Sequence, residues 1–297
     1  DADAWQGAMA TLGPESRRPL NTVVACHTLC SLRRAVKPTP DGPPPPRLPS
    51  PRLRVHDSPT LPHAPPQFDH TVVRVSERDT LDEAAAQVAT LGDNGRVLVL
   101  DMGNPTSPGG GWLRGAGAQE EELFRRTSLA LALDPAAGAP AGIYPLPEYG
   151  CVTCHDVGMW RAGPADGYRP LPAPVLFDVI VGCAYNAAQE PWLLDDGRLS
   201  SEGVRRTARK IAALLDCAIT GGYHTVILGA LGCGAFRNPA PCIARLFRDA
   251  LRARAGHFRL IDFRPRRRLA GLLVVDSPGP ARLRATIRWA LRYLGFR

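Results

Sequence analysis

An apolar run, a glycine-rich loop and a run of carboxylates follow one another between residues 97 and 127, and this order constrains the fold more than any other feature of the chain. Residues 97–100 are continuously apolar and end before a Gly-Asn-Pro turn, which is typical of a strand buried on both faces. Three glycines follow at 109–111, and because they lack a Cβ, backbone N–H groups there can approach an anion closely. Residues 119–133 are then predicted to form a helix with glutamates in its first turn. The stretch therefore predicts a strand, loop and helix unit with an anion site at the loop.

The glutamates at the start of this helix can be used in two ways. Glu121 and Glu122 each precede an arginine by four residues, Arg125 and Arg126, so both can form ion pairs on a solvated helix face. Alternatively, one of them is a general acid, because a carboxyl group that is buried near an anion has a raised pKa and can donate a proton near neutral pH. The residues alone leave both uses open.

Three segments carry motifs that occur together in one known family. The first consists of Gly109-Gly110-Gly111, a spacer of seven residues and then Gln119-Glu120-Glu121. The second, residues 101–104, is similar to an Asp-Phe-Ala-Asn segment, and the third, residues 228–239, is similar to a diphosphate-binding loop followed by an aromatic residue. Together they resemble the poly(ADP-ribose) glycohydrolases, in particular the short bacterial-type branch built on a macrodomain. The resemblance spans residues 71–254.

For this chain the resemblance implies an enzyme, a glycoside hydrolase that cleaves the ribose–ribose O-glycosidic bond of poly(ADP-ribose) and releases ADP-ribose. Glu121 would protonate the leaving ribose oxygen and then activate the attacking water, as one group that changes from acid to base. Glu120 and Asn104 would fix the distal ribose hydroxyls, and Gln119 would orient the start of the helix. Because Glu120 and Glu121 lie about 100° apart around a helix, we expect that they do not both face one bond.

The same resemblance implies that two loops hold the diphosphate of the terminal ADP-ribose. The implied substrate-binding loop residues are Gly109, Gly110 and Gly111 in the first loop, and Gly232, Cys233, Gly234, Ala235 and Phe236 in the second. Both loops can point backbone N–H groups at one diphosphate if their strands are neighbours. The resemblance implies no metal and no cofactor.

Two other classes of protein stay open at this point. A macrodomain that only binds ADP-ribose or ADP-ribosylated proteins would use the same two loops without cleavage. A nucleotide-dependent Rossmann enzyme fits less well, because neither glycine loop has the Gly-x-Gly-x-x-Gly spacing followed by an acidic residue about 20 positions on. The expected partners are poly(ADP-ribose) and poly(ADP-ribosyl)ated proteins, with nucleic acid involved only indirectly, no membrane, and a monomeric chain.

The alternation of strands and helices predicts an α/β fold, and the resemblance makes it a macrodomain-like three-layer α/β/α sandwich with a mixed central sheet. With 297 residues, 44% of them hydrophobic, the chain can bury a sizeable core. We expect a divergent N-terminal helical segment at 1–36, a proline-rich linker or strap at 37–68 and the catalytic domain at 69–297. Prolines favour an extended backbone and supply no N–H donor, which is the reason for the predicted linker.

The remaining elements follow from hydrophobic periodicity and from turn residues. We expect strands at 71–75, near 151–159, and at 177–183, 224–228, 258–263 and 269–275. Helices are expected at 20–36, 81–89, 202–217, 241–253 and 281–294. Thr80 and Glu83 have the spacing of a capping box for the second of these helices. Residues 134–174 carry many prolines and glycines, and apart from a strand or two near 151–159 their sequence does not indicate which elements they form.

The net charge of +8 comes almost entirely from arginine, since Lys37 and Lys210 are the only lysines. A GC-rich genome and a surface that attracts a polyanion both explain this bias. Arg284, Arg288 and Arg292 form one stripe of the helix predicted at 281–294, where they are either solvated or dock a polyanion. No run of about 18 apolar residues and no leader-like segment is present, so we expect an intracellular protein, cytoplasmic or nuclear in a eukaryote.

The eight cysteines are expected to be reduced, because the chain lacks the short secreted context of a disulfide framework. Cys26 and Cys30, four residues apart, are expected on the packed face of the first helix. Residues 151–155, CVTCH, match the short pattern for covalent haem or half of a zinc site, but no later spacing supplies a second pair of zinc ligands.

Overall fold

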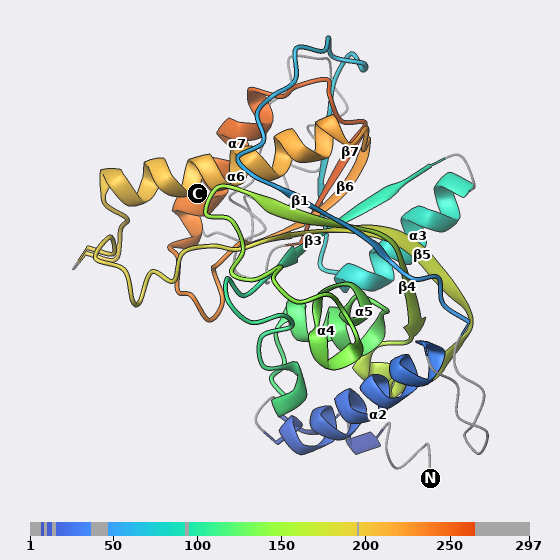
Figure 1. The fold of residues 1–297 in the computed structure, drawn as a ribbon. Coiled ribbons are helices and arrows are strands. Elements are labelled where there is room, and N and C mark those ends of the chain that lie inside the picture. The colour runs from blue at the N-terminus through green and yellow to red at the C-terminus, as the bar shows by residue number, and fades with distance from the viewer. Residues whose placement is uncertain are drawn as a thin grey trace.

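The computed structural model describes residues 7–8, 11–13, 16–36, 47–92, 95–194 and 196–264. Its strands are β1 (Arg52–His56), β2 (Val72–Val75), β3 (Val97–Met102), β4 (Cys151–Arg161), β5 (Pro170–Gly182), β6 (Thr225–Gly229) and β7 (Leu260–Arg264). They form one seven-stranded sheet in the order β1-β4-β5-β3-β6-β7-β2 (Figure 1). The β1–β4 and β4–β5 pairs are antiparallel and the other pairs are parallel, so the sheet is mixed.

Helices cover both faces of this sheet (Figure 1). They are α2 (Arg18–Val36), α3 (Thr80–Leu91), α4 (Gln119–Arg126), α5 (Ala130–Leu133), α6 (Ser201–Thr220) and α7 (Ala240–Arg252). The alternation within β3 shows how the two faces are packed: Val97 and Val99 belong to the core shared with α3, α4 and α5, whereas Leu98 and Leu100 belong to the core shared with α6 and α7. The predicted three-layer α/β/α sandwich with a mixed sheet is confirmed.

The strand order brings the two glycine loops together. β3 lies between β5 and β6 and is parallel to both. Since the carboxyl ends of parallel strands meet at one edge of a sheet, the segment that leaves β3 and the segment that leaves β6 emerge side by side. The condition set by the sequence, that the strands before the two loops are neighbours, is met.

The helix predicted at 119–133 is interrupted. α4 ends at Arg126, and Thr127 has an extended backbone with φ −128° and ψ 175° that forms an antiparallel bridge to Met159 in β4. The chain resumes a helix only at α5. The prediction of one continuous helix was wrong because Thr127 takes a backbone partner in the sheet, which helical periodicity cannot reveal.

The start of α3 also differs from the prediction. Thr80 is the first helical residue and Asp79 is the N-cap, whose Oδ1 accepts the backbone N–H groups of Leu81 at 3.0 Å and Asp82 at 3.2 Å. The capping box of Thr80 and Glu83 does not form, because the Glu83 carboxylate is occupied by arginines.

The proline-rich stretch contributes to the sheet. Residues 52–56 within it form β1, which pairs along the outer side of β4 with Arg52 opposite His155. A strand of five residues bracketed by prolines suits a sheet edge, where a residue without an N–H donor is tolerated. The predicted linker or strap therefore includes an edge strand, and the boundary at residue 69 does not separate the sheet from what precedes it. The limits of the domains stay a prediction.

The helix predicted at 20–36 is confirmed as α2, but it does not use the predicted face. Cys26 and Cys30 are exposed, and the buried residues of the helix are Asn21, Val24, Ala25, Thr28, Ser31 and Leu32. The strand predicted at 269–275 and the helix at 281–294 with its arginine stripe lie outside the described residues. Among the residues that are described, no helix is long and apolar enough to cross a membrane.

Candidate active site

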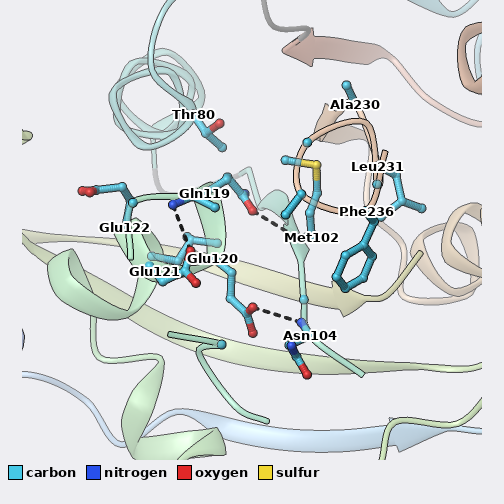
Figure 2. Close-up of a pocket in the computed structure, with 18 of the residues that line it drawn as sticks. Thr80, Met102, Asn104, Gln119, Glu120, Glu121, Glu122, Ala230, Leu231 and Phe236 are labelled. Atoms are coloured by element: carbon cyan, nitrogen blue, oxygen red, sulfur yellow. Dashed lines mark hydrogen bonds between the residues drawn. The ribbon is translucent and has the colours of Figure 1, made fainter. Parts of the chain in front are cut away.

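A pocket of about 520 Å³ lies where β3 and β6 end (Figure 2). Its walls come from the N-terminal ends of α3 and α4, the segment after β3 and the loop after β6. All of the site residues that the sequence predicted line this pocket except Gly109. The structure therefore brings both glycine loops and the Gln-Glu-Glu segment to one cavity.

Gln119 fixes the start of α4 against β3. Its Nε2 donates to the carbonyl oxygen of Leu100 at 2.6 Å, and its Oε1 accepts the backbone N–H of Met102 at 3.0 Å. The side-chain amide thus pairs with one carbonyl and one N–H group at the end of the strand, as the backbone of a neighbouring strand would. This contact holds the first turn of α4 at the edge of the sheet.

The carboxylate of Glu121 is held by two backbone N–H groups. Oε1 accepts from Gly111 at 3.0 Å and Oε2 accepts from Ala118 at 2.9 Å. Ala118 is the N-cap of α4, so Glu121 also satisfies one of the N–H groups that a helix leaves unpaired at its start. With only 7% of the residue exposed, Glu121 is a fixed and largely desolvated carboxylate that faces the pocket.

Gly110 lies between the two glutamates. It has a φ of +54°, and a Cβ at this position would lie 2.8 Å from Oε1 of Glu121 and 3.0 Å from Oε2 of Glu120. Both carboxyl groups therefore approach the same spot. The expectation that Glu120 and Glu121 do not both face one bond stays a prediction, although both side chains reach toward Gly110.

Glu120 is buried next to a second carboxyl group, Asp101 of β3. Burial, together with the nearby Asp101 and Glu121 carboxyls, raises the pKa of Glu120 to about 9, while a hydrogen bond from the backbone N–H of Asn104 to Oε2 acts in the opposite direction. Burial, together with the charge of Glu121, also raises the pKa of Asp101 well above its ordinary value. Glu120 is consequently protonated and uncharged at neutral pH.

Asp101 does not line the pocket but lies close enough to raise the pKa of Glu120, and the sequence assigned it no role. It is fully buried, and neither of its carboxyl oxygens has a hydrogen-bond partner among the described residues; the same is true of Oε1 of Glu120 and the hydroxyl of Tyr144. Burial raises the pKa of Tyr144, and the charges of Asp101 and Glu120 add to this effect. The signal in the sequence was a carboxylate that directly follows a continuous apolar strand.

Two of the three N–H groups of the first glycine loop are bonded within the protein. The N–H of Gly110 donates to the carbonyl oxygen of Ser107 at 3.0 Å, and that of Gly111 donates to Glu121. Gly109 faces away from the pocket, since a Cβ there would meet the rings of Trp112 and Phe124. In the structure these glycines permit a tight turn around Glu121, and a role of the loop in holding the diphosphate stays a prediction.

The second loop is built to receive an anion. The backbone N–H groups of Gly234, Ala235 and Phe236 make no hydrogen bond to another group in the described part of the chain. The loop is held in shape by Asn238, whose Nδ2 donates to the carbonyl oxygen of Tyr185 at 2.7 Å and to that of Gly232 at 3.2 Å. Free donors on a fixed loop at the edge of a sheet suit a diphosphate.

Asn104 uses only part of its side chain within the protein. Its Oδ1 accepts the backbone N–H groups of Thr106 at 2.9 Å and Ser107 at 3.0 Å, which fixes the turn after β3. No hydrogen bond from its Nδ2 is found in the part of the chain that the structure describes, so this amide can donate to a ligand in the pocket.

The ion pairs proposed for a solvated face of α4 are not formed. Arg125 and Arg126 are both fully buried. Arg125 pairs with Glu122 rather than Glu121, and Arg126 reaches back to α3, where Nη1 lies 2.6 Å from Asp79 and Nη2 lies 2.7 Å from Asp82. Glu121 is thereby left free of an arginine partner, which favours the second of the two uses considered for it.

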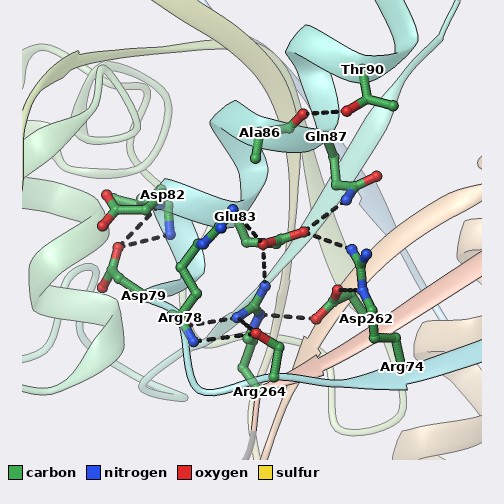
Figure 3. A network of polar contacts seen from close by, with 12 residues as sticks. Arg74, Arg78, Asp79, Asp82, Glu83, Ala86, Gln87, Thr90, Asp262 and Arg264 are labelled. Carbon is green, nitrogen blue, oxygen red and sulfur yellow. Dashed lines mark hydrogen bonds and ion pairs between the residues drawn. The ribbon is translucent and has the colours of Figure 1, made fainter.

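A polar network holds the α3 end of the pocket (Figure 3). The buried carboxylate of Glu83 lies 2.7 Å from both Arg74 and Arg264 and 3.2 Å from Arg78. Arg264 also donates to the backbone carbonyl of Arg78 at 2.9 Å and pairs with Asp262 at 3.0 Å. Because Arg78 directly precedes the N-cap of α3, this network fixes one wall of the pocket against β2 and β7.

Among the described residues, no group of three or more histidine, cysteine, aspartate or glutamate side chains could hold a metal ion. Cys151 and Cys154 of the CVTCH pattern are buried within β4, and Cys233 is half-buried in the second loop. Burial raises the pKa of the Cys233 thiol to about 12. This thiol is therefore neutral at physiological pH and acts as part of the loop wall.

Comparison with known proteins gives matches of two kinds. Residues 51–140 match the family model of the microbial-type PARG catalytic domain, whose abbreviation stands for poly(ADP-ribose) glycohydrolase. The matched residues include β1 and the segment from the triple glycine to Glu121. No curated protein matches the chain at a significant level.

Solved structures similar to this chain include the poly(ADP-ribose) glycohydrolase of Thermomonospora curvata bound to the inhibitor ADP-HPD, at 25% identity and a TM-score of 0.63 over 92% of this chain and 99% of that chain. A second structure of the same enzyme has 24% identity and a TM-score of 0.65, covering 92% and 100%. The enzyme of Deinococcus radiodurans in complex with ADP-ribose has 22% identity and a TM-score of 0.56, covering 95% and 94%. The resemblance inferred from the motifs is thus confirmed. The segment that contains the triple glycine and α4 matches the microbial-type poly(ADP-ribose) glycohydrolase family, and the chain has the macrodomain-like fold of the similar structures.

Proposed function

We propose that this chain hydrolyses ribose–ribose O-glycosidic bonds in poly(ADP-ribose) and releases ADP-ribose. The observation that carries the proposal is the placement of Glu121, a desolvated carboxyl group fixed by the N–H groups of Gly111 and Ala118 at the wall of the pocket. It lies in the same cavity as a loop with free N–H donors. An enzyme that binds a diphosphate and acts on the attached sugar requires both groups in one cavity.

Glu121 is the general acid and base of this proposal. In its protonated form it donates to the leaving ribose oxygen as the glycosidic bond breaks, and an oxocarbenium-like centre forms on the distal ribose. The resulting carboxylate then takes a proton from the water that attacks this centre, which regenerates the acid. The hydrogen bonds from Gly111 and Ala118 hold the oxygen atoms in place through both steps.

Glu120 contributes as a neutral group. Since its raised pKa of about 9 keeps it protonated at neutral pH, it can donate a hydrogen bond to a ribose hydroxyl without placing a second negative charge near the diphosphate. Asn104 lies beside it and offers its Nδ2 to the same sugar. The two residues would fix the distal ribose while Glu121 acts on the bond.

The diphosphate is assigned to the second loop, from Gly232 to Phe236, and the ring of Phe236 provides an apolar surface next to it (Figure 2). The glycines at 110 and 111 shape the cavity by their lack of side chains. The proposal also includes three expectations from the sequence: the polymer is carried by poly(ADP-ribosyl)ated proteins, the chain is monomeric, and the protein is intracellular.

Incubation of the purified chain with labelled poly(ADP-ribose), followed by separation of the products, tests this function. Release of ADP-ribose is expected. If the chain binds ADP-ribose in calorimetry but releases no product from the polymer, the protein is a binding module rather than a hydrolase. If it does neither, the assignment of the pocket is wrong.

A further inference from the structure

Arg125 of α4 is fully buried, and its guanidinium group serves two partners at once. Nη2 donates to Oε1 of Glu122 at 2.6 Å, and Nη1 donates to the carbonyl oxygen of Ala116 at 2.7 Å. Glu122 also accepts the hydroxyl of Tyr168, whose oxygen lies 2.8 Å from Oε1 and 3.1 Å from Oε2. The buried charge of Arg125 is thus balanced by Glu122, while its second bond is directed at the backbone.

The carbonyl that Arg125 holds belongs to the loop between the triple glycine and α4. Gly115 and Gly117 give this loop backbone freedom, so its conformation depends on contacts from outside. Two residues after Ala116, the N–H of Ala118 donates to Oε2 of Glu121 at 2.9 Å. A shift of Ala116 would therefore move a donor that holds the Glu121 carboxylate.

The helix α2 contacts both this loop and α4. Asn21 donates to the carbonyl oxygen of Gly115 at 3.2 Å, and the Thr28 hydroxyl donates to the carbonyl oxygen of Arg125 at 2.9 Å. Gly115 has a φ of +75° and lies so close to the carbonyl oxygen of Arg18 that a Cβ would clash with it. The buried face of α2 thus contributes one hydrogen-bond donor to the loop and one to α4, in addition to apolar packing.

We propose that Arg125 is a positioning residue, which acts on Glu121 through the loop 115–118, and that α2 is part of the same device through Asn21 and Thr28. The inference rests on the proposed function, because it concerns the group that acts on the glycosidic bond. Removal of Arg125 should lower kcat and leave the binding of ADP-ribose nearly unchanged, since the loop from Gly232 to Phe236 is not touched by it.

The test uses the full chain with the double substitution Arg125→Met and Glu122→Gln. Both charges are removed together, so that no buried charge is left without its partner. Steady-state kinetics on poly(ADP-ribose), ADP-ribose calorimetry and thermal unfolding are measured on the same preparation. We expect kcat to fall about 10-fold or more, as for a small displacement of a catalytic group, with KM and ADP-ribose affinity little changed.

A matched control is available on the other side of the sheet. Arg254, just after α7, pairs with Asp216 of α6 at 2.6 Å, and their side chains are only 8% and 6% exposed. Neither residue lines the pocket. The double substitution Asp216→Asn and Arg254→Met removes a buried ion pair of the same kind and should change the melting temperature without changing kcat.

Two further variants separate positioning from mere support of the fold. Arg125→Lys keeps the charge for Glu122, but one ammonium group cannot reproduce the fork that also reaches Ala116, so an intermediate kcat is expected. The pair Asn21→Leu and Thr28→Val removes the donors of α2 and should lower kcat while ADP-ribose still binds.

The outcomes differ clearly. An Arg125→Met/Glu122→Gln protein that is less stable but has the kcat of the unaltered chain would overturn the inference. A loss of kcat with an equal loss of ADP-ribose binding sites would also overturn the inference, because equal losses indicate that a fraction of the variant protein is unfolded. Absence of turnover by the unaltered chain would instead contradict the proposed function, so the two failures are told apart by that one measurement.

Discussion

Oε1 of Glu121 accepts the backbone N–H of Gly111 at 3.0 Å, so the acid at the start of α4 and the last of the three glycines form one unit. A glutamine at position 121 can accept this bond through its own oxygen, but its NH2 group would then face the N–H of Ala118, a second donor. The proton that the proposed mechanism requires is lost at the same time. The glycine loop and the acid are therefore tested by one substitution.

Glu121→Gln should lower the turnover of poly(ADP-ribose) by about 10²-fold or more, as expected for a lost general acid, while ADP-ribose still binds. Product release and ADP-ribose calorimetry on the same preparation measure the two effects. Glu122→Gln does not serve as the control, because Glu122 neutralises the buried Arg125. Glu202→Gln does, since Glu202 is a partly exposed carboxylate in the first turn of α6 that does not line the pocket. Equal activity of the 121 variant and this control would remove Glu121 from the mechanism.

Gly110→Ala should abolish most activity, because the added Cβ would lie 2.8 Å from Glu121 and 3.0 Å from Glu120, and both carboxyls must move. Its φ of +54° adds a strain of about 1–2 kcal/mol. Gly92→Ala is the matched control: it has a φ of +59°, but no atom lies within 4 Å of its Cβ. Similar losses of stability in both variants, with loss of turnover only at position 110, are expected. Normal turnover of Gly110→Ala would show that the carboxyls need not sit where the structure has them.

Glu120 makes stability depend on pH. Its pKa is about 9 in the folded chain and 4.5 in its ordinary state, so between these values the folded state holds a proton that the unfolded state releases. Its contribution is present below the lower value and is lost as pH rises toward the higher one, by up to about 1.4 kcal/mol per pH unit. Glu120→Gln removes this term. The free energy of unfolding of the variant minus that of the unaltered chain should rise between about pH 5 and 9 in denaturant titrations. A flat difference would contradict the raised pKa.

Arg264→Met should destabilise the fold by about 3 kcal/mol or more, because it leaves the buried carboxylates of Glu83 and Asp262 without one of their cations. Arg248→Met is its control, since Arg248 pairs with an exposed Asp249 and should cost less than about 1 kcal/mol. Urea unfolding of both variants gives the comparison. Equal effects would mean that the network at the α3 end of the pocket is no more than a surface feature.

The central unit of this protein could be predicted because its signals are local. A continuous apolar run, consecutive glycines and a first turn of carboxylates each determine the backbone of the residues that carry them. The meeting of the two loops could also be foreseen, because parallel strands release their ligand-binding segments at one edge of the sheet. Asn104, Gln119 and Glu121 were accordingly placed in the right cavity.

What the sequence did not predict depends on partners that are remote along the chain. Arg126 pairs with Asp79, 47 residues away, and Thr28 bonds to the backbone of Arg125, 97 residues away. A pattern of i,i+4 charges indicates a solvated face only when no other element covers it, and here α3 and α2 do. The protonated state of Glu120 likewise arises from burial beside Asp101, which no spacing along the chain expresses.

The strands β1 and β2 are close in sequence yet occupy opposite edges of the sheet. Arg52 in β1 contacts Asp156, 104 residues later, and Arg74 in β2 contacts Asp262, 188 residues later. During synthesis each of these strands therefore leaves the ribosome before the strand with which it pairs, and it stays unpaired until much of the chain has been made. An unpaired strand can pair with another chain, and arginines along it oppose such aggregation by mutual repulsion. The arginines of β1 and β2 are thus placed on the two strands of the sheet that most need this protection.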